Sequence, residues 1–504
     1  MFLFSQELEA LNIYCGNAKQ CNHAFGVYFK GFFMGSVGWG RHALRDSRWL
    51  RLLRNLRYLL KRVSLLHLLL LLGAVSRPVM AQVLPPTSNP AASQTAPGTG
   101  ELGRLLGLPA DGALRISGVW VGNGTDQWFG GISEGPSGGL INPNEAAQEL
   151  LLEASLDLGK AIGLDHTWIW VQGLQVNATT DAGLPSGSVQ GSNSLVAAPP
   201  LDRTELFEFA LRKDLFDRRL RLVAGKQSAS TVFANINRPD VTRDPRYEIS
   251  SLTSLAFTPV YSMPTLLGRL PGYTNSAFGV TATWLPELFL SRAYVSAGVF
   301  DGRAGLRDAS IQTGLVTPSL TGPLFAIAEV GSGWVAGNAL KPGSFGFGVW
   351  SQGGESVVCD RFDPGLCFSE LGAWGLYGLL NQRLSSFRPE VDSSGINGFI
   401  STGWSPSTTN QMSLSITAGL TAQGVLKSRP DDSVGLGLSW ARINTRDFLA
   451  DSFNSNELML QVYKQISLAP ALYLQPAITY LPLVSLRDAQ ANSLSGMVQL
   501  TMLF

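Results

Sequence analysis

The chain has 504 residues, of which 45% are hydrophobic and 15% are charged, with 55 Gly and 25 Phe. The hydrophobic content excludes a disordered chain, and the length exceeds that of one ordinary globular domain. Many glycines and aromatics, little charge and the lack of a long apolar run after residue 81 favour a transmembrane β-barrel over a helical membrane protein.

The charge is distributed unevenly along the chain. Residues 1–81 carry 11 Lys and Arg against 3 Asp and Glu, so the remaining chain carries 27 basic and 34 acidic side chains. This acidic part contains no basic stripe, and nucleic acid is therefore not an expected partner.

Residues 1–81 are predicted to be a leader that ends in a secretory signal peptide. A basic stretch at 48–62 precedes a leucine-rich run at 63–75, and a V-M-A cleavage motif ends at Ala81. The apolar run is shorter than the roughly 20 residues that a membrane-spanning helix needs, although a retained signal anchor remains the alternative. Because this signal lies far from the first residue, we expect translation to start at Met34 or later.

The mature chain is predicted to begin with a linker and to continue as a barrel. Residues 82–101 are rich in Pro, Ser, Thr and Ala, which is typical of a flexible linker, and residues 102–504 follow as the barrel. Sixteen segments of the barrel are strand candidates, and an even number is typical of single-chain bacterial barrels. They are 114–123, 149–157, 167–176, 204–214, 219–226, 276–285, 293–301, 324–331, 344–351, 373–383, 396–405, 411–422, 433–444, 455–466, 471–481 and 493–504.

The last five candidate strands show the clearest alternation. In 411–422 one face carries Ser, Thr and Gly, and the other carries the apolar residues Met412, Leu414, Ile416, Ala418 and Leu420. An apolar face suits lipid and a small or polar face suits a wet interior, whereas a soluble barrel fills its centre with bulky apolar groups. A large soluble β-sandwich or solenoid remains the alternative, because its strands also alternate.

The final strand ends on Phe504. An aromatic carboxyl terminus resembles the signal that the barrel-assembly machinery reads in outer-membrane proteins, although Met502 stands where that signal often carries a second aromatic. We therefore expect this machinery and outer-membrane lipid to be partners of the chain.

Several motifs resemble those of one known family. They are L-F-E-F-A-L-R-K-D-L-F-D-R-R-L-R-L-V-A-G-K at 206–226, followed by Phe233, then A-Y-V-S-A-G-V-F-D-G at 293–302, and the closing segments 375–382, 429–437, 456–463 and 472–480. In order and spacing they resemble the carbohydrate-selective porins of the OprB family, over about residues 102–504. The leader, the proline-rich start and a pair of cysteines depart from that family.

The resemblance implies an all-β fold, a transmembrane antiparallel β-barrel of sixteen strands in the bacterial outer membrane. It also implies that small sugars diffuse through this barrel into the periplasm, and it does not identify the sugar.

Charged side chains in two strands are candidates for lining the pore. Glu208, Arg212 and Arg221 alternate with apolar residues such as Phe207 and Phe209, which are expected to face lipid. An Arg or Lys at the midplane of the lipid band would cost about 2–4 kcal/mol, so the charged residues are expected to point inward. The alternative is that these side chains brace the wall as ion pairs.

A long loop supplies further candidates. Residues 227–275 exceed a turn, and a loop of this length commonly has a function. In porins one loop often folds inward to narrow the pore, and a solvated outer loop is the alternative here. The candidate residues in the loop are Asn235, Asn237, Arg238, Asp240, Arg243 and Tyr247.

Other candidates lie on later strands. Asp301 and Arg303 border the same channel or cap a turn, and Glu457, Gln461 and Tyr463 occupy the polar face of 455–466. Aromatic residues near strand ends are instead expected to form the interfacial girdle; they are Trp168, Trp170, Trp284, Trp350, Trp374, Trp404, Trp440 and Tyr480.

Two cysteines remain after removal of the leader. Cys359 and Cys367 flank D-R-F-D-P-G-L in a predicted loop, so we expect a disulfide in an oxidising compartment. Metal binding is the weaker alternative, because no His lies nearby.

An enzyme is not expected. After residue 81 the chain contains one histidine, His166, without a Ser or Asp at a known catalytic spacing. The glycine-containing stretch at 118–124 lacks the Lys-Ser/Thr continuation of a phosphate loop, and no cofactor or metal site is expected.

These features together predict a porin that allows passive, carbohydrate-selective diffusion of small sugars. A plugged outer-membrane barrel that acts as a surface structural or adhesion protein is the alternative. Whether the chain is a monomer or a homo-oligomer stays open.

Overall fold

The computed structural model describes residues 99–132, 144–179, 186–195, 202–236, 254–257, 263–267, 269–272, 275–286, 293–302, 323–336, 341–359, 367–389, 391–392, 394–444, 454–485 and 492–504. Within these ranges it describes 356–359 and 367–370 by their backbone alone. All of these residues belong to one compact unit, 77–504. The predicted leader and most of the predicted linker lie outside the described residues.

Strands make up most of the described chain. In chain order the elements are α4 (Glu101–Leu105), β1 (Leu114–Gly130), β2 (Asn144–Asp157), α5 (Leu158–Ile162), β3 (Thr167–Ala178), β4 (Arg203–Leu215), β5 (Leu220–Gln227), the 3-10 turns η2 (Ala229–Thr231) and η5 (Pro264–Leu266), β6 (Ala277–Trp284), β7 (Ala293–Asp301), β8 (Leu324–Ala336), β9 (Lys341–Cys359), β10 (Cys367–Ser386), β11 (Gly395–Trp404), β12 (Met412–Gln423), β13 (Ser433–Ile443), β14 (Asn456–Ala469), β15 (Leu472–Leu483) and β16 (Ser493–Leu503).

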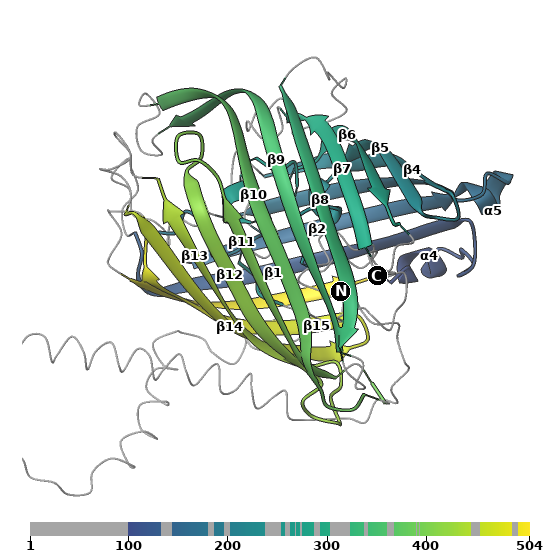
Figure 1. Ribbon diagram of the computed structural model, residues 1–504. Coiled ribbons are helices and arrows are strands. Elements are labelled where there is room, and N and C mark those ends of the chain that lie inside the picture. The colour runs from purple at the N-terminus through teal and green to yellow at the C-terminus, as the bar shows by residue number, and fades with distance from the viewer. Residues whose placement is uncertain are drawn as a thin grey trace, which may run out of the picture. The chain divides into compact units, whose positions relative to one another are not determined.

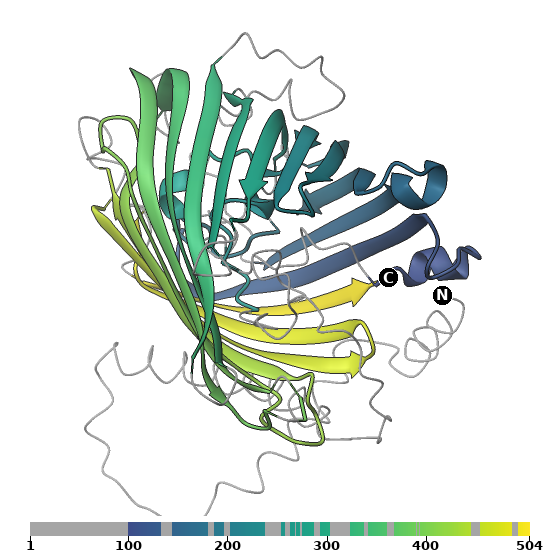
Figure 2. The same cartoon turned by 45° about the vertical axis from the view of Figure 1, so that its right-hand side comes forward.

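The sixteen strands form one closed barrel. Each strand pairs antiparallel with its neighbours in the chain, and β1 pairs with β16, where Val119 lies opposite Leu503 and Asn123 opposite Gln499. The ribbon colours follow this order, so the yellow β16 lies beside the dark blue β1 (Figures 1 and 2). A closed barrel leaves no unpaired strand edge, which is what a lipid environment requires.

The predicted fold class and all sixteen predicted strands are confirmed. The largest difference is the hairpin of β9 and β10, which extends the predicted strands 344–351 and 373–383 as far as Cys359 and Cys367. The extension was missed because residues 352–356, Q-G-G-E-S, have no apolar alternation.

The predicted alternation of faces is confirmed on the closing strands. On β14, Leu460 and Val462 are 37% and 55% exposed, whereas the intervening side chains are 1% exposed or less. The exposed face is apolar and the other face is mixed; the residues on that second face are Glu457, Met459, Gln461 and Tyr463.

The prediction that Phe207 faces lipid is wrong. Where β4 pairs with β3, Gln172 lies opposite Glu208 and the next residue, Gly173, lies opposite Leu206, so Phe207 is the extra residue of a β-bulge. The bulge turns Phe207 inward, where its side chain is 1% exposed.

A second bulge corrects the predicted face of Met412. Ile443 lies opposite Met412 and its neighbour Arg442 lies opposite Leu414, which leaves Ser413 as the extra residue. Met412 is therefore buried, while the following apolar positions of β12 keep their predicted exposure.

The predicted girdle role is wrong for three aromatic residues. Trp168 lies under the guanidinium of Arg212, Trp170 donates to the buried Glu208, and Trp350 is itself buried. Their strands place these rings inward. Three others are exposed as a girdle requires: Trp284, Trp374 and Trp404.

Backbone pairing supports the predicted disulfide. Cys359 at the end of β9 lies opposite Cys367 at the start of β10. Opposite residues of an antiparallel pair have Cα atoms about 4.5–5.5 Å apart, within the roughly 4.4–6.8 Å that a disulfide spans. We propose that these cysteines are bonded in the exported protein.

This proposal predicts the labelling of Cys359 and Cys367 by a thiol reagent. In protein purified without reductant from cells that export it, peptide mapping should find neither cysteine labelled before reduction and both labelled after it. The variant Cys359→Ser should leave Cys367 open to labelling without reductant. Labelling of both residues in the unreduced wild-type protein would contradict the bond.

Candidate functional site

The described parts of two segments between strands lie inside the barrel. We call residues 228–236, 254–257, 263–267, 269–272 and 275–276 the β5–β6 segment, and residues 179, 186–195 and 202 the β3–β4 segment. Backbone groups of the β5–β6 segment at Ala234, Ile236 and Ala256 bond to side chains of β8, β10 and β14. One segment can reach strands on so many sides of a closed barrel only from within.

The β5–β6 segment packs aromatic and aliphatic side chains onto the inner wall. The ring of Phe233 meets Phe300 of β7 edge-on, with 6.5 Å between centroids, and Phe325 of β8 stacks on Trp350 of β9 at 6.1 Å. All four rings belong to one buried cluster. The inner wall, predicted to be small or polar, is therefore apolar where this segment covers it.

Glycine in the wall lets the segment approach closely. A Cβ on Gly437 of β13 would collide with the side chain of Leu255, and a Cβ on Gly419 of β12 would also crowd it. Leu255 is fully buried there, in a cluster with Phe399 and Tyr463. The small inward residues predicted on these strands thus make room for the side chain of Leu255.

Glu329 of β8 anchors the same segment by hydrogen bonds. Its carboxylate accepts from the backbone N–H of Ala234 at 2.9 Å and from the hydroxyls of Tyr294 and Tyr377 at 2.7 and 2.6 Å. Glu329 is 1% exposed, so donors of the chain, these three among them, take the place of water around its carboxylate.

Glu208 holds the start of the segment. It accepts from the backbone N–H of Ser228 at 2.7 Å and from the indole N–H of Trp170 at 2.7 Å, and it is 3% exposed. The sequence placed Glu208 on the inward face, and the structure agrees. Its partners are wall and segment groups, so Glu208 braces the interior by hydrogen bonds, whereas the alternative considered for it was an ion pair.

Glu457 of β14 anchors the β3–β4 segment. It accepts from the Ser188 hydroxyl at 2.6 Å and from the backbone N–H groups of Val189 and Gln190 at 2.8 and 3.2 Å. It also accepts from the hydroxyl of Ser485. This candidate, too, has its acceptor oxygens occupied by chain groups.

Gln461 and Tyr463 lie along the same face of β14. The Gln461 side-chain oxygen accepts from the backbone N–H of Ala256 at 2.7 Å, and the Tyr463 hydroxyl lies 2.9 Å from the hydroxyl of Thr421. The backbone N–H of Ser194 donates to the carbonyl of Ala256 at 2.9 Å, so the two segments also bond to each other.

Arg212 and Arg221 converge on one carboxylate, Asp214. Arg212 Nη2 lies 2.5 Å and Arg221 Nε 3.4 Å from the Asp214 oxygens. The Arg212 guanidinium also lies 4.7 Å from the centre of the Trp168 ring. The arginine side chains are 29% and 20% exposed and Asp214 is 1% exposed, so part of each arginine side chain stays accessible while the carboxylate does not.

The remaining candidates are only partly covered by the structure. Asn235 is half-buried in the β5–β6 segment, and Asp301 is 2% exposed at the end of β7. The candidates outside the described residues are Asn237, Arg238, Asp240, Arg243, Tyr247 and Arg303.

Sequence reasoning missed two polar groups. Glu329 is the one acidic residue in the otherwise apolar run L-F-A-I-A-E-V-G, and that isolation was a usable signal. The second group is a buried cluster in which Arg203 lies 2.8 Å and Lys226 3.3 Å from the Glu205 carboxylate. The sequence carried no signal for this cluster, because its members belong to two strands.

Within the described ranges, no group of three or more His, Cys, Asp or Glu side chains is arranged to hold a metal ion. No helix in this part of the chain is both long and apolar enough to cross a membrane.

The anchoring role of Glu329 predicts that Glu329→Gln loosens the β5–β6 segment. The amide has one acceptor oxygen and two donors, so a donor among Ala234, Tyr294 and Tyr377 loses its partner at a cost of about 1–3 kcal/mol. Trypsin should then cut the folded barrel faster after Arg243 and Arg246.

A matched control is Tyr294→Phe, which removes one donor and keeps the bond to Ala234. Its cleavage rate should change less than that of Glu329→Gln. Equal cleavage of wild type and Glu329→Gln, with both barrels shown to be folded by heat-modifiable gel migration, would contradict the anchor.

The comparisons with known structures concern the fold. The high-pH structure of Pseudomonas putida OprB aligns at a TM-score of 0.64 and 15% identity, over 80% of this chain and 96% of that chain. The low-pH structure of the same protein aligns at a TM-score of 0.48 and 13% identity, over 80% of this chain and 96% of that chain. The outer membrane channel DcaP of Acinetobacter baumannii aligns at a TM-score of 0.42 and 11% identity, over 79% of this chain and 99% of that chain.

A search of curated proteins gave no match. A family model, described as carbohydrate-selective porin, OprB family, matches residues 144–482, which is well over half of the chain. The match covers β2 to β15 almost completely, including both inward segments. The chain therefore belongs to the OprB family of carbohydrate-selective porins.

Proposed function

We propose that the chain is a passive outer-membrane channel through which small carbohydrates diffuse into the periplasm. The observation that carries the proposal is membership of the OprB family in a chain whose closed barrel holds an anchored inner segment. An anchored inner segment is suited to narrowing a pore, and diffusion down a gradient needs no cofactor and no catalytic group. Exposed apolar side chains on the outer face, such as Phe347 and Val462, support a lipid environment.

Arg212 and Arg221 are the predicted pore residues best suited to contact a sugar. Both side chains are partly exposed, whereas Glu208 and Glu457 are buried with their oxygens already bonded. Guanidinium N–H groups can donate to sugar hydroxyls, and the ring of Trp168 beside them offers an apolar face.

A plugged barrel that acts as a surface protein is the second candidate. The observation that favours it is the extent of apolar packing between the inner wall and the β5–β6 segment, seen in two buried clusters. Conductance separates the two candidates, because a plug passes no ions.

We also propose that residues 1–81 are removed on export and that the barrel-assembly machinery recognises the strand that ends at Phe504. The sequence patterns described above support both statements. Amino-terminal sequencing of protein from the outer membrane tests the first, with Gln82 as the expected first residue.

Single-channel recording in planar bilayers tests the sugar channel. Discrete open steps are expected, and added mono- or disaccharide should reduce them in a saturable way. The variant Arg212→Gln should raise the half-saturating sugar concentration about fivefold, because it loses a hydrogen bond worth about 1 kcal/mol.

The control is Lys213→Gln on the opposite face of β4, where the ammonium bonds to the Asp165 carbonyl. This variant should respond to sugar as wild type does. Open steps whose conductance is unaffected by added sugar would support a pore and contradict its selectivity for carbohydrates. The lack of any steps from a folded barrel would favour the plugged surface protein.

A further inference from the structure

Two connections at one end of the barrel expose large apolar side chains. The β2–β3 connection, residues 158–166, contains α5, and its Ile162 and Leu164 are 67% and 50% exposed. In the β4–β5 connection, residues 216–219, Phe216 is 72% exposed. We call these two connections the foot; α5 lies in it at the end of β2 (Figures 1 and 2). The end of a bacterial barrel with short connections faces the periplasm.

The β2–β3 connection is bonded to β4, which leads into the other part of the foot. The backbone N–H of Asp214 donates to the carbonyl of His166 at 2.9 Å, and the Lys213 ammonium donates to the carbonyl of Asp165 at 2.8 Å. The side chain of Asp157 caps the first turn of α5. These bonds make the foot a fixed extension of the barrel wall.

The β4–β5 connection holds its apolar side chain in a backbone conformation that such residues rarely adopt. Phe216, Asp217 and Arg218 have φ angles of 53°, 53° and 67°, and none of them is glycine. Strain of this kind persists where the surrounding structure enforces it, and it is concentrated at functional sites. The conformation of this turn therefore indicates a function for the exposed Phe216.

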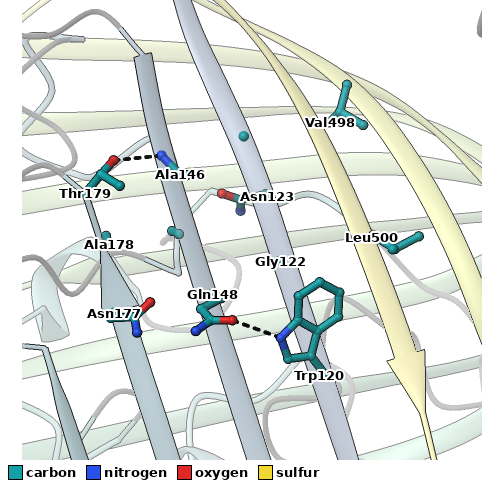
Figure 3. A pocket seen from close by; sticks show the side chains of 12 residues that line it. Trp120, Gly122, Asn123, Ala146, Gln148, Asn177, Ala178, Thr179, Val498 and Leu500 are labelled. Atoms are coloured by element: carbon teal, nitrogen blue, oxygen red, sulfur yellow. Dashed lines mark hydrogen bonds between the residues drawn. The ribbon is translucent and has the colours of Figure 1, made fainter. Parts of the chain in front are cut away.

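Amide side chains limit the apolar outer face of β2 and β3 at the end away from the foot. Gln148 of β2 lies opposite Asn177 of β3 on the outer wall, beside a groove of about 560 Å³ (Figure 3). Gln175 is the next outward residue of β3, since Val176 is fully buried on the other face. Amides are costly to place in hydrocarbon, so the lipid band on β3 lies on the foot side of Gln175.

The outer face of β3 is too short to fill this lipid band. On the foot side of Gln175 the strand continues for seven residues, 167–173, whose outward positions are apolar or glycine as far as Ile169. A tilted strand needs about 9–11 residues to cross the hydrocarbon of a bilayer. The missing length is available only in the foot, where Leu164 and Ile162 come next.

Lys213 marks the level of the lipid headgroups on this side of the barrel. It lies on the outer face of β4 opposite Thr167, and its ammonium bonds to the carbonyl of Asp165 in the foot. Long basic side chains near a membrane surface extend toward the headgroup layer in this way. The foot therefore lies at the boundary between headgroups and acyl chains.

On another side of the barrel the apolar band ends within the strands. The outward apolar residues of β13 begin at Val434 and stop before Arg442. Lys464 of β14 lies opposite Val434 and limits the band at the end with short connections. The β12–β13 connection, residues 424–432, lies beyond this limit, so we expect its Leu426 to contact water although it is 61% exposed.

We propose that the foot is an interfacial anchor whose apolar side chains, Ile162, Leu164 and Phe216, insert into the periplasmic leaflet of the outer membrane. Lipid is the occupant of this surface because the foot continues the outer wall, where Phe209 and Leu211 are exposed and apolar. An anchor on one side fixes the depth and tilt of the barrel. The inference rests on the proposed outer-membrane location and is independent of sugar transport.

Depth measurements with spin labels test the anchor. The four native cysteines are replaced by Ser, and a nitroxide is attached at Ile162→Cys or Phe216→Cys. The full chain is folded into vesicles of phosphatidylcholine and phosphatidylglycerol, and relaxation by oxygen and by a nickel chelate reports the depth of each label. Both labels should lie about 5–10 Å inside the headgroup boundary.

Two controls separate the anchor from the location of the barrel. Leu426→Cys lies at the same end and has similar exposure, and its label should be relaxed by the nickel chelate in water. Val462→Cys on the outer wall should report hydrocarbon. Heat-modifiable gel migration confirms that each labelled barrel is folded.

The outcomes distinguish the two proposals. Water at Ile162 and Phe216, with hydrocarbon at Val462, would overturn the anchor and leave the barrel in the membrane. Water at Val462 as well would overturn both. A Leu426 label as deep as the Ile162 label would overturn an anchor confined to one side.

A charge in the foot tests whether its apolar contact holds the barrel. Ile162→Asp should move the label at Phe216→Cys toward water, because a carboxylate is costly among acyl chains. The matched variant Leu426→Asp should leave the Phe216 label at its original depth. A Phe216 label that keeps its depth in Ile162→Asp would contradict the anchor.

Discussion

Pairing of β1 with β16 is the contact on which the other features of this barrel depend. It joins the first and last strands, which are separated by nearly the whole described chain, and it gives every strand two neighbours. A membrane offers no water to unpaired backbone groups, so an open sheet would not be stable there. Closure also separates an inner from an outer face of the sheet, and the two faces carry different kinds of side chain.

On the inner face, buried carboxylates and an amide hold backbone N–H groups of the two inward segments. Glu208, Glu329 and Glu457 each accept at least one such N–H, and Gln461 does the same through its side-chain oxygen. A segment inside a barrel cannot pair its backbone with a strand ladder, so wall side chains must supply the acceptors. Apolar packing around Phe233 and Leu255 stabilises the same segment without directing its hydrogen bonds.

On the outer face, the wall is not uniform around the barrel. Most of it is apolar and suits lipid, whereas β1–β3 carries amides beside a groove floored by glycine and alanine. The Arg212, Arg221 and Asp214 cluster lies on the inner face of strands next to this region.

The alternation of residues along the chain was enough to predict the number, order and approximate bounds of the strands and which face of most strands is apolar. It could do so because side chains alternate with a period of two residues, which is a local property. It also predicted inward positions for Glu208, Arg212 and Glu457. The tertiary structure alone decided the bulge that turns Phe207 inward, because a bulge is a relation between two strands. It likewise decided the partners of Glu329 and the groove beside Gln148, since these bring together residues far apart in the chain.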